Sequence, residues 1–139
     1  MSYCTQADIV RRIGTDDLVK LSDYDGDGSP DAAVVTQAIE DAQGDIDSYL
    51  ETKFAVPVTP TPDVLRKHCV TMAIYYLQLG RDSVTEHYRK AYEDILKWLK
   101  DVVAGTATLG SGTTPAASPG APNVRYDVQP RAFGRDKPL

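Results

Sequence analysis

Apolar residues recur at helical spacing along most of residues 1–104 of the chain. Three stretches keep this spacing over several turns, namely residues 30–53, 63–80 and 83–104. Spacing of three and four residues places apolar side chains on one face, so each stretch predicts a long amphipathic helix. The first would have about 24 residues and a length of about 36 Å. The three patterns are carried by Val35, Ala38, Ile39, Ala42, Ile46, Tyr49 and Leu50, then Leu65, Cys69, Met72, Tyr75, Tyr76 and Leu79, then Val84, Tyr88, Ala91, Ile95, Trp98, Leu99 and Val102.

Two shorter helices are predicted before the long ones. Thr5 is suited to cap a helix with the sequence QADIVRRI, and Asp8 three residues later forms an imperfect capping box. Gly14 ends this helix, and Thr15 opens a second one that continues as DDLVKLS. The later segment FAVPVTPTPD has three prolines, which exclude a helix and favour an extended linker before the cap at Asp63.

These elements together predict an all-α fold. We expect a small bundle of three longer helices with the two short helices at its N-terminal end. Aromatic residues at helical spacing usually pack in a core, so Tyr76, Tyr88 and Trp98 are assigned to packing and not to ligand binding. The predicted core consists of Ile39, Ile46, Leu50, Leu65, Met72, Tyr76, Ile95, Trp98 and Leu99.

The composition changes abruptly after Gly105. Residues 106–122 are mostly Gly, Ser, Thr, Ala and Pro, which is typical of a flexible linker. We therefore divide the chain into a helical body, residues 1–104, and a linker with a C-terminal docking arm, residues 105–139. In the arm an alternating strand-like piece is followed by a basic peptide, and we expect it to be disordered until it docks on a partner. Tyr126 and Phe133 would be anchors and Arg125, Arg131 and Arg135 rim contacts.

Composition and charge bound the class of protein. The 139 residues include 42% apolar and 25% charged residues, which is ordinary for a single soluble domain. No run approaches the length of a membrane span, and the N-terminus MSYCTQADIV has no signal-peptide pattern, so we expect the protein to stay in the cytoplasm where it is made. Residues 1–63 carry 4 basic and 13 acidic side chains, whereas residues 64–139 carry 11 basic and 7 acidic ones. Such a bipolar subunit could stack head to tail, or its two faces could differ by chance.

The two cysteines lack the spacing of a metal or redox motif. Cys4 and Cys69 are isolated in the sequence, so we expect reduced thiols and not a disulfide framework. His68 is adjacent to Cys69, but neighbouring residues point about 100° apart on a helix, which argues against a zinc site.

Residues 21–31, LSDYDGDGSPD, match the first half of an EF-hand calcium loop. Counted from Asp23, the carboxylates of Asp23, Asp25, Asp27 and Asp31 occupy positions 1, 3, 5 and 9, and a glycine stands at position 6. Position 12, which should be a bidentate glutamate, is Val34. The alternative is an acidic turn that starts the long helix, with Ser29 as N-cap and Pro30 in the first turn. We favour the capping turn and expect weak calcium binding or none, and no required cofactor.

No catalytic constellation is recognisable in the sequence. Ser22, Ser48 and Ser83 have no nucleophile-elbow context, and the GSG at 110–112 lies in the linker with no strand before it. The sequence therefore predicts a protein that is not an enzyme.

The assembled pattern resembles a known family. The opening YCTQADIV, the DGDG loop, the DIDSYL stretch leading into KFAVPV, and PRAFGRD near the C-terminus are similar to the Mu-like phage and prophage connector family, long catalogued as a protein of unknown function. The resemblance covers residues 3–104. It implies a helical head-completion or adaptor protein of tailed phages, which forms a ring beneath the portal and receives the tail.

The resemblance also implies partners and a location. We expect a homo-oligomeric ring, twelvefold to match a portal, that contacts the portal protein and a tail-proximal connector or tail terminator. DNA would pass through the ring without specific binding, because the acidic excess of residues 1–63 repels phosphates. The protein would assemble in the host cytoplasm and remain in the neck of the virion, without a membrane role. The alternatives are a calcium-dependent protein-binding module that uses the acidic loop, or another structural protein of the tail end.

Overall fold

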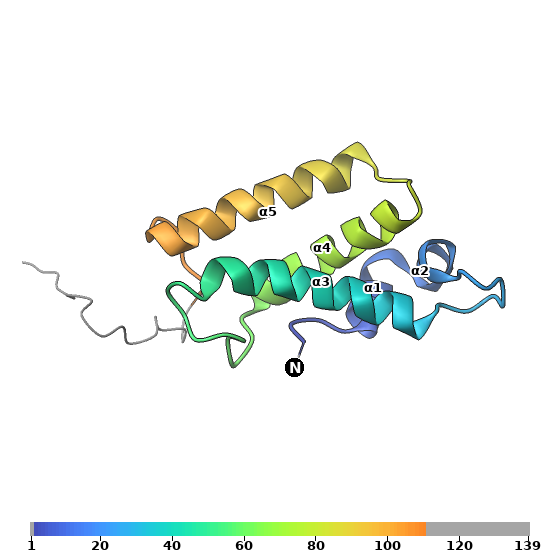
Figure 1. The fold of residues 1–139 in the computed structure, drawn as a ribbon, viewed down its shortest axis with the longest axis horizontal. Coiled ribbons are helices and arrows are strands. Elements are labelled where there is room, and N and C mark those ends of the chain that lie inside the picture. The colour runs from blue at the N-terminus through green and yellow to red at the C-terminus, as the bar shows by residue number, and fades with distance from the viewer. Residues whose placement is uncertain (1, 111–139) are drawn as a thin grey trace, which may run out of the picture.

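The computed structural model describes residues 2–110, and within them every regular element is a helix (Figure 1). The five helices are α1 (Gln6–Ile13), α2 (Thr15–Ser22), α3 (Ala32–Leu50), α4 (Asp63–Gly80) and α5 (Glu86–Ala104). The all-α prediction of three longer and two short helices is confirmed. None of the described helices is long and apolar enough to cross a membrane.

Helix α4 is the centre of the bundle. It contacts α3 and α5 along its length, and it also contacts α1 and α2. Figure 1 shows α3 and α5 running in the opposite direction to α4, with α1 and α2 gathered near the end where α3 begins. Because α4 is covered from several directions, apolar side chains are buried around most of its circumference, including those of Val70, Ala73, Ile74 and Leu77.

The N-terminal helices begin and end at the residues that the sequence predicted. The side chain of Thr5 accepts a hydrogen bond from the Asp8 N–H at 3.3 Å, and the Asp8 carboxylate accepts one from the Thr5 N–H at 3.0 Å. The capping box is therefore complete, although Asp stands where Glu is usual. Gly14 separates α1 from α2 and has a φ of 86°, a backbone conformation that residues with a Cβ rarely adopt.

Two longer helices are shorter than predicted. Helix α3 has 19 residues and begins after Asp31, because Ser29 is used inside the preceding loop, where its N–H and hydroxyl bind the Asp27 carboxylate. Helix α5 begins after Thr85, whose side chain accepts a hydrogen bond from the Tyr88 N–H at 3.4 Å. Ser83, the predicted start, instead donates its N–H to the carbonyl of Gln78 and closes the end of α4.

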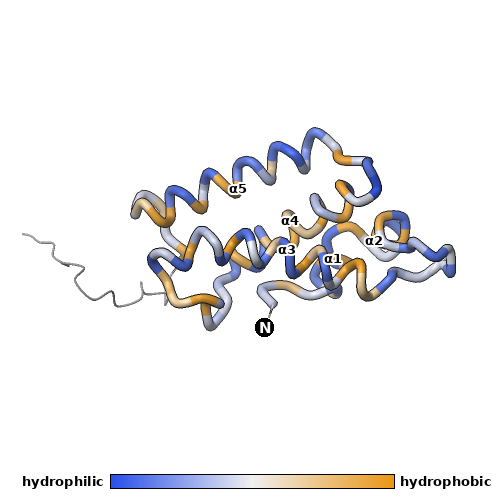
Figure 2. The backbone as a smooth tube through the Cα atoms, viewed as in Figure 1, coloured by the Kyte–Doolittle hydropathy of each residue, from blue (hydrophilic) through white to orange (hydrophobic). Residues whose placement is uncertain are grey.

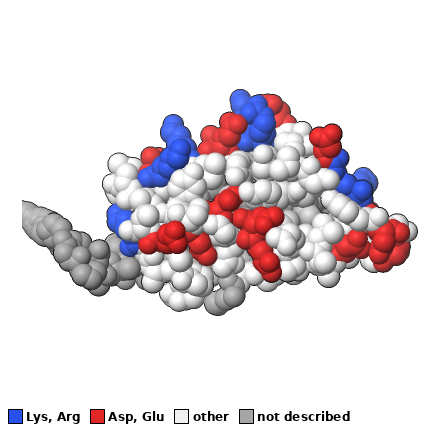
Figure 3. Space-filling model, in the orientation of Figure 1, with Lys and Arg blue, Asp and Glu red and all other residues white. Residues whose placement is uncertain are grey.

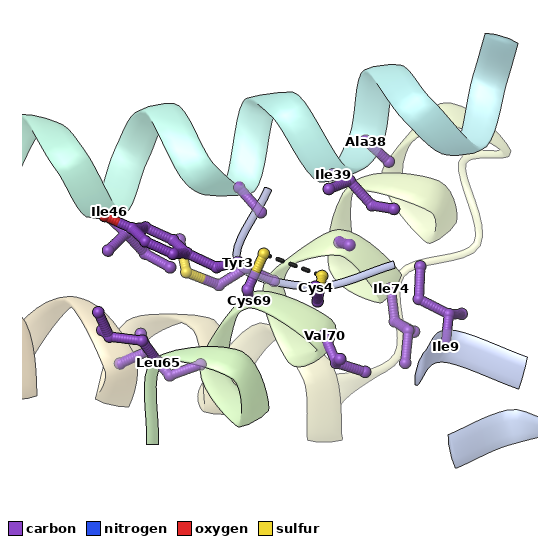
Figure 4. Packing of buried hydrophobic residues seen from close by; sticks show 14 of the residues in the cluster. Tyr3, Cys4, Ile9, Ala38, Ile39, Ile46, Leu65, Cys69, Val70 and Ile74 are labelled. Carbon is purple, nitrogen blue, oxygen red and sulfur yellow. Dashed lines mark hydrogen bonds between the residues drawn. The ribbon is translucent and has the colours of Figure 1, made fainter. Parts of the chain in front are cut away.

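The predicted core is largely correct. Seven of its nine residues are buried, while Tyr76 and Trp98 are partly buried at the edge of the same cluster. Leu79 was expected on the buried side of α4 but is 50% exposed, although Leu77 and Gln78 in the same turn are buried, so its side chain projects away from the core. Figure 2 shows the hydrophobic colour along α4 and the hydrophilic outer edge of α5, and Figure 4 shows the buried side chains between α3 and α4.

Packing continues past the last helix. Gly105 ends α5 in the left-handed conformation with a φ of 91°, and Leu109 then returns to the core and is 3% exposed. A shortened chain that preserves this contact should therefore end after Gly110. The division into body and arm stays a prediction, because residues 111–139 lie outside the described part of the chain.

Candidate functional site

The acidic loop between α2 and α3 brings its four carboxylates together. One oxygen from each of Asp23, Asp25, Asp27 and Asp31 lies within 4.8 Å of the others. Within residues 2–110, no other group of three or more His, Cys, Asp or Glu side chains is gathered in this way. Figure 3 shows acidic side chains at this end of the molecule and along α3, with basic side chains mainly at the edge that α5 forms.

Asp23 organises the loop from within. One of its carboxylate oxygens accepts hydrogen bonds from the N–H groups of Gly26 at 2.8 Å and Asp27 at 3.2 Å, and the other accepts one from Gly28 at 2.9 Å. Gly26 and Gly28 both have a φ near 80°, at 80° and 83° respectively, which only glycine adopts without strain. These hydrogen bonds and glycine conformations give the loop a defined shape.

Arg81 fastens the base of this loop to the end of α4. Its guanidinium donates to the backbone carbonyl of Asp23 and stands 4.4 Å from the ring centroid of Tyr24, a cation–π distance. The N–H of Tyr24 donates to the Asp31 carboxylate at 3.0 Å. Sequence reasoning missed this contact, because Tyr24 and Arg81 are far apart in the chain and Arg81 belongs to no motif.

The carboxylates affect one another's protonation. Hydrogen bonds from backbone N–H groups, that of Gly28 first, lower the pKa of Asp23. The N–H of Asp27 lowers the pKa of Asp25, but the hydrogen bond shared with Asp23, desolvation and the charges of Asp27 and Asp31 have the larger combined effect. The pKa of Asp25 is therefore raised. Repulsion among like charges is the condition that a bound cation would relieve.

The loop offers only part of a calcium shell. Position 12 of the EF-hand pattern is Val34, which is half-buried in the first turn of α3 and has no oxygen ligand in its side chain. Oxygen atoms of Asp23, Asp25, Asp27 and Asp31 would be the ligands of a hard divalent cation, with the remaining positions left to water. The arrangement fits weak binding of a cation better than a tight calcium site.

A shallow groove of about 320 Å³ adjoins the loop between α3 and α4. Its lining is mostly apolar, with a half-exposed tyrosine on one wall. The lining residues are Tyr24, Ala33, Val34, Gln37, Ala38, Asp41, Tyr76 and Leu77. The hydroxyls of Tyr76 and Tyr92 both donate to the carboxylate of Asp45, the second at 3.0 Å, and so hold the α3, α4 and α5 surfaces together beside the groove.

The other predicted site residues are not part of this arrangement. Tyr126, Phe133, Arg125, Arg131 and Arg135, the predicted partner-binding residues, lie outside the described residues. His68 and Cys69 do not share a metal site, since the His68 ring packs 4.7 Å from the Trp98 ring and the Cys69 sulfur faces Cys4. The described residues therefore present a charged loop and an adjoining groove as the candidate site.

Fold and loop together define the class as a small helical protein with an acidic surface loop. The chain belongs to the Bacteriophage Mu Gp36 family, whose model matches residues 3–127. Gene product J of Escherichia phage Mu is 35% identical over 137 residues, which cover 97% of this chain and 96% of that protein. The Mu-like prophage FluMu protein gp36 of Haemophilus influenzae is 33% identical over 108 residues, 78% of this chain and 75% of that protein. The resemblance to a Mu-like phage family is thereby confirmed, and the protein is a bacteriophage protein.

Proposed function

We propose that this protein is a structural, non-enzymatic subunit of the phage neck, a head–tail connector that forms a ring between portal and tail. The observation that carries the proposal is the extent of the family match, which runs past the helical body to residue 127. The alignment with gene product J covers 97% of the chain and so includes most of the predicted arm. The similarity thus covers the helical body and most of the predicted arm, as expected if both are needed for one task.

The structure supports a ring subunit in two ways. The body is a single packed cluster in which α4 contacts each of the other helices, so it is suited to carry load between neighbours. Its acidic loop is exposed and is fastened by Arg81, which gives a fixed charged surface at one end. A ring subunit needs such rigid surfaces, because the same contacts are repeated around a symmetry axis.

The arm would attach the ring to its partners. Each copy contributes one arm, so weak docking of Tyr126 and Phe133 is multiplied by the effective concentration of the other arms. Arg125, Arg131 and Arg135 would pair with acidic groups around the anchors. The partners proposed are further copies in a twelvefold ring, the portal protein and a tail-proximal connector or tail terminator. The protein would act in the host cytoplasm during assembly and then in the virion.

The test is the assembly of phage particles that lack this protein. A phage with the gene deleted should produce filled heads without tails, and the full chain supplied in trans should restore tailed particles. Immunogold labelling of complete virions should place the protein at the head–tail junction. Normal head–tail joining without the protein would refute the proposal.

A second set of variants tests the arm. A chain that ends after Gly110 keeps the buried Leu109 and should stay folded, but it should restore few tailed particles. The double variant Tyr126→Ala, Phe133→Ala should behave in the same way, and the matched control Tyr126→Phe should restore assembly. If the shortened chain restores assembly fully, the arm has no docking role, whereas the connector role is judged by the deletion alone.

The acidic loop supports a second candidate, a calcium-dependent protein-binding module. Its specific observation is the set of four carboxylates within 4.8 Å of one another. Calorimetric titration with calcium separates the candidates, because the connector requires only weak binding or none. Tight binding that is lost in Asp25→Ala and retained in the matched control Asp41→Ala would favour the module. If the protein is instead another structural protein of the tail end, immunogold labelling should place it at the far end of the tail.

A further inference from the structure

Two cysteines that are far apart in the sequence meet in the core. The Sγ atoms of Cys4 and Cys69 are 3.0 Å apart, and the thiol of Cys4 points at the sulfur of Cys69 (Figure 4). Both side chains are buried, at 2% and 0% exposure. Cys4 lies in the segment before α1 and Cys69 in the second turn of α4. A disulfide bond is about 2.05 Å long, so an approach of about 1 Å would join the two sulfurs.

Neighbouring contacts hold Cys4 in this position. On one side the Tyr3 hydroxyl donates to the Asp47 carboxylate and accepts the N–H of Val58 at 2.9 Å. On the other side Thr5 caps α1. The backbone of Cys4 is thus fixed at both ends, and the meeting of the sulfurs follows from tertiary structure.

We propose that Cys4 and Cys69 form a redox-sensitive pair that low-molecular-weight disulfides, such as oxidised glutathione, convert into an intramolecular disulfide. The sulfur of Cys4 attacks the small disulfide, whose S–S bond breaks. One small thiol leaves with the proton that Cys4 loses. The sulfur of Cys69 then attacks the sulfur of Cys4, and a second small thiol leaves with the proton of Cys69. The protein loses two protons and two electrons, which together reduce the small disulfide to two thiols.

Cys4 is the first to react because it belongs to the terminal segment, which has only to lift from the core to meet solvent. Cys69 lies on the central helix and is reached only after Cys4. Its hydrogen bond with Cys4 and then its burial raise the pKa of the Cys69 thiol, which keeps the sulfur protonated while the core is closed. The reduced pair is therefore stable in a reducing cell and oxidises slowly outside it.

The disulfide would connect the N-terminal segment to α4 and close a loop that contains α1, α2 and α3. Closing a long loop restricts the unfolded chain and raises the stability of the folded one. The chain has only two cysteines, so an intramolecular disulfide has a single possible pairing. This inference is independent of the connector role, and each can fail without the other.

The experiment uses the full chain, incubated with oxidised glutathione or with dithiothreitol at about pH 8. This pH is close to the ordinary pKa of cysteine, about 8.5. After denaturation the oxidised sample should show no free thiols, and its intact mass should be lower by two hydrogens with no glutathione adduct. Its thermal midpoint should rise by several degrees, and dithiothreitol should reverse the change. Unchanged thiols, a stable glutathione adduct, a disulfide-linked dimer or a lower midpoint would each overturn the proposal.

Two variants sharpen the test. Cys4→Ala should show no rise in midpoint after the same treatment, whereas a rise would overturn the assignment of the pair. Tyr3→Phe keeps both cysteines but loosens the terminal segment, and it should oxidise severalfold faster than the natural chain. An unchanged rate would overturn the step in which Cys4 opens first. The result with the natural chain decides the proposal even if Cys4→Ala does not fold.

Discussion

Acidification should destabilise this protein through His68. The ring of His68 is half-buried and packs 4.7 Å from the ring of Trp98 on α5. Burial first, and then the charges of Lys67 and Arg12, lower the pKa of His68 to about 4. The folded state therefore prefers the neutral ring, whereas in the unfolded chain the pKa of histidine is about 6.5. Between these two values the unfolded chain binds more protons, so the free energy of unfolding falls as the pH falls from about 6.5 to about 4.

The structure sets an upper limit for the size of this effect. Each pKa unit corresponds to about 1.4 kcal/mol, so the full shift to about 4 amounts to about 3 kcal/mol, of which about 2 kcal/mol is lost by pH 5. His68 is only half-buried, and water screens its charged form, so we expect a loss of about 1 kcal/mol between pH 7 and pH 5. In a domain of this size that loss lowers the thermal midpoint by about 4 °C.

The assay is urea denaturation of the natural chain and His68→Gln at both pH values. Carboxylates titrate over the same range, so the informative quantity is the difference between the two proteins. The natural chain should lose about 1 kcal/mol more than His68→Gln on acidification. His87→Gln, which removes an exposed histidine, is the matched control. Equal losses in the natural chain and His68→Gln would refute the reasoning.

Three further outcomes are expected. Leu99→Ala should cost about 2 to 5 kcal/mol in urea denaturation because Leu99 is fully buried, and the half-exposed control Leu79→Ala should cost less than about 0.5 kcal/mol; equal costs would contradict the packing. Tyr3→Phe should cost about 1 to 3 kcal/mol, since the buried N–H of Val58 loses its acceptor, and an unchanged midpoint would exclude that role. Fluorescence anisotropy should show no tight binding of duplex DNA, and strong salt-sensitive binding would contradict the acidic character of residues 1–63.

The helices were predictable because their signals are local. Periodic apolar residues and the capping residues Thr5, Gly14 and Gly105 act within a few positions of the backbone that they shape. The predicted starts of α3 and α5 were wrong because a nearby serine was an equally good cap by sequence. Ser29 and Ser83 form other hydrogen bonds in the folded chain, and only their partners decide this.

The surroundings of α4 were beyond local reasoning. A pattern with one apolar face predicts one buried side, but four other helices contact α4, so Val70, Ala73, Ile74 and Leu77 are buried as well. Leu79 continues the apolar pattern but projects to solvent, although Leu77 and Gln78 in the same turn are buried. A periodic pattern shows where a helix is apolar but not how many neighbours cover it.

In the candidate site, too, local features were predictable from the sequence and long-range contacts were not. Its four carboxylates come from one short loop, so the sequence predicted the cluster, and the structure brings the four together. The contact of Arg81 with Tyr24 joins α4 to the loop over a long sequence distance and left no signal. The pairing of Cys4 with Cys69 is of the same kind, and isolated spacing gave no reason to expect it.

The inner and outer carboxylates of the loop differ in exposure. Asp23 and Asp31 are half-buried and accept N–H groups of the loop itself, so their charge is used to hold its shape. Asp25 and Asp27 are exposed. None of the ion pairs among the described residues places a cationic side chain against Asp25, so the repulsion from its negatively charged neighbours is not compensated. An approaching cation would therefore meet the outer pair first. The outer pair also accepts hydrogen bonds of the loop, Asp25 from the N–H of Asp27 at 3.1 Å and Asp27 from the N–H of Ser29 at 2.9 Å. Substitution of either pair should therefore loosen the loop, and substitution of the outer pair would also remove its most exposed charge.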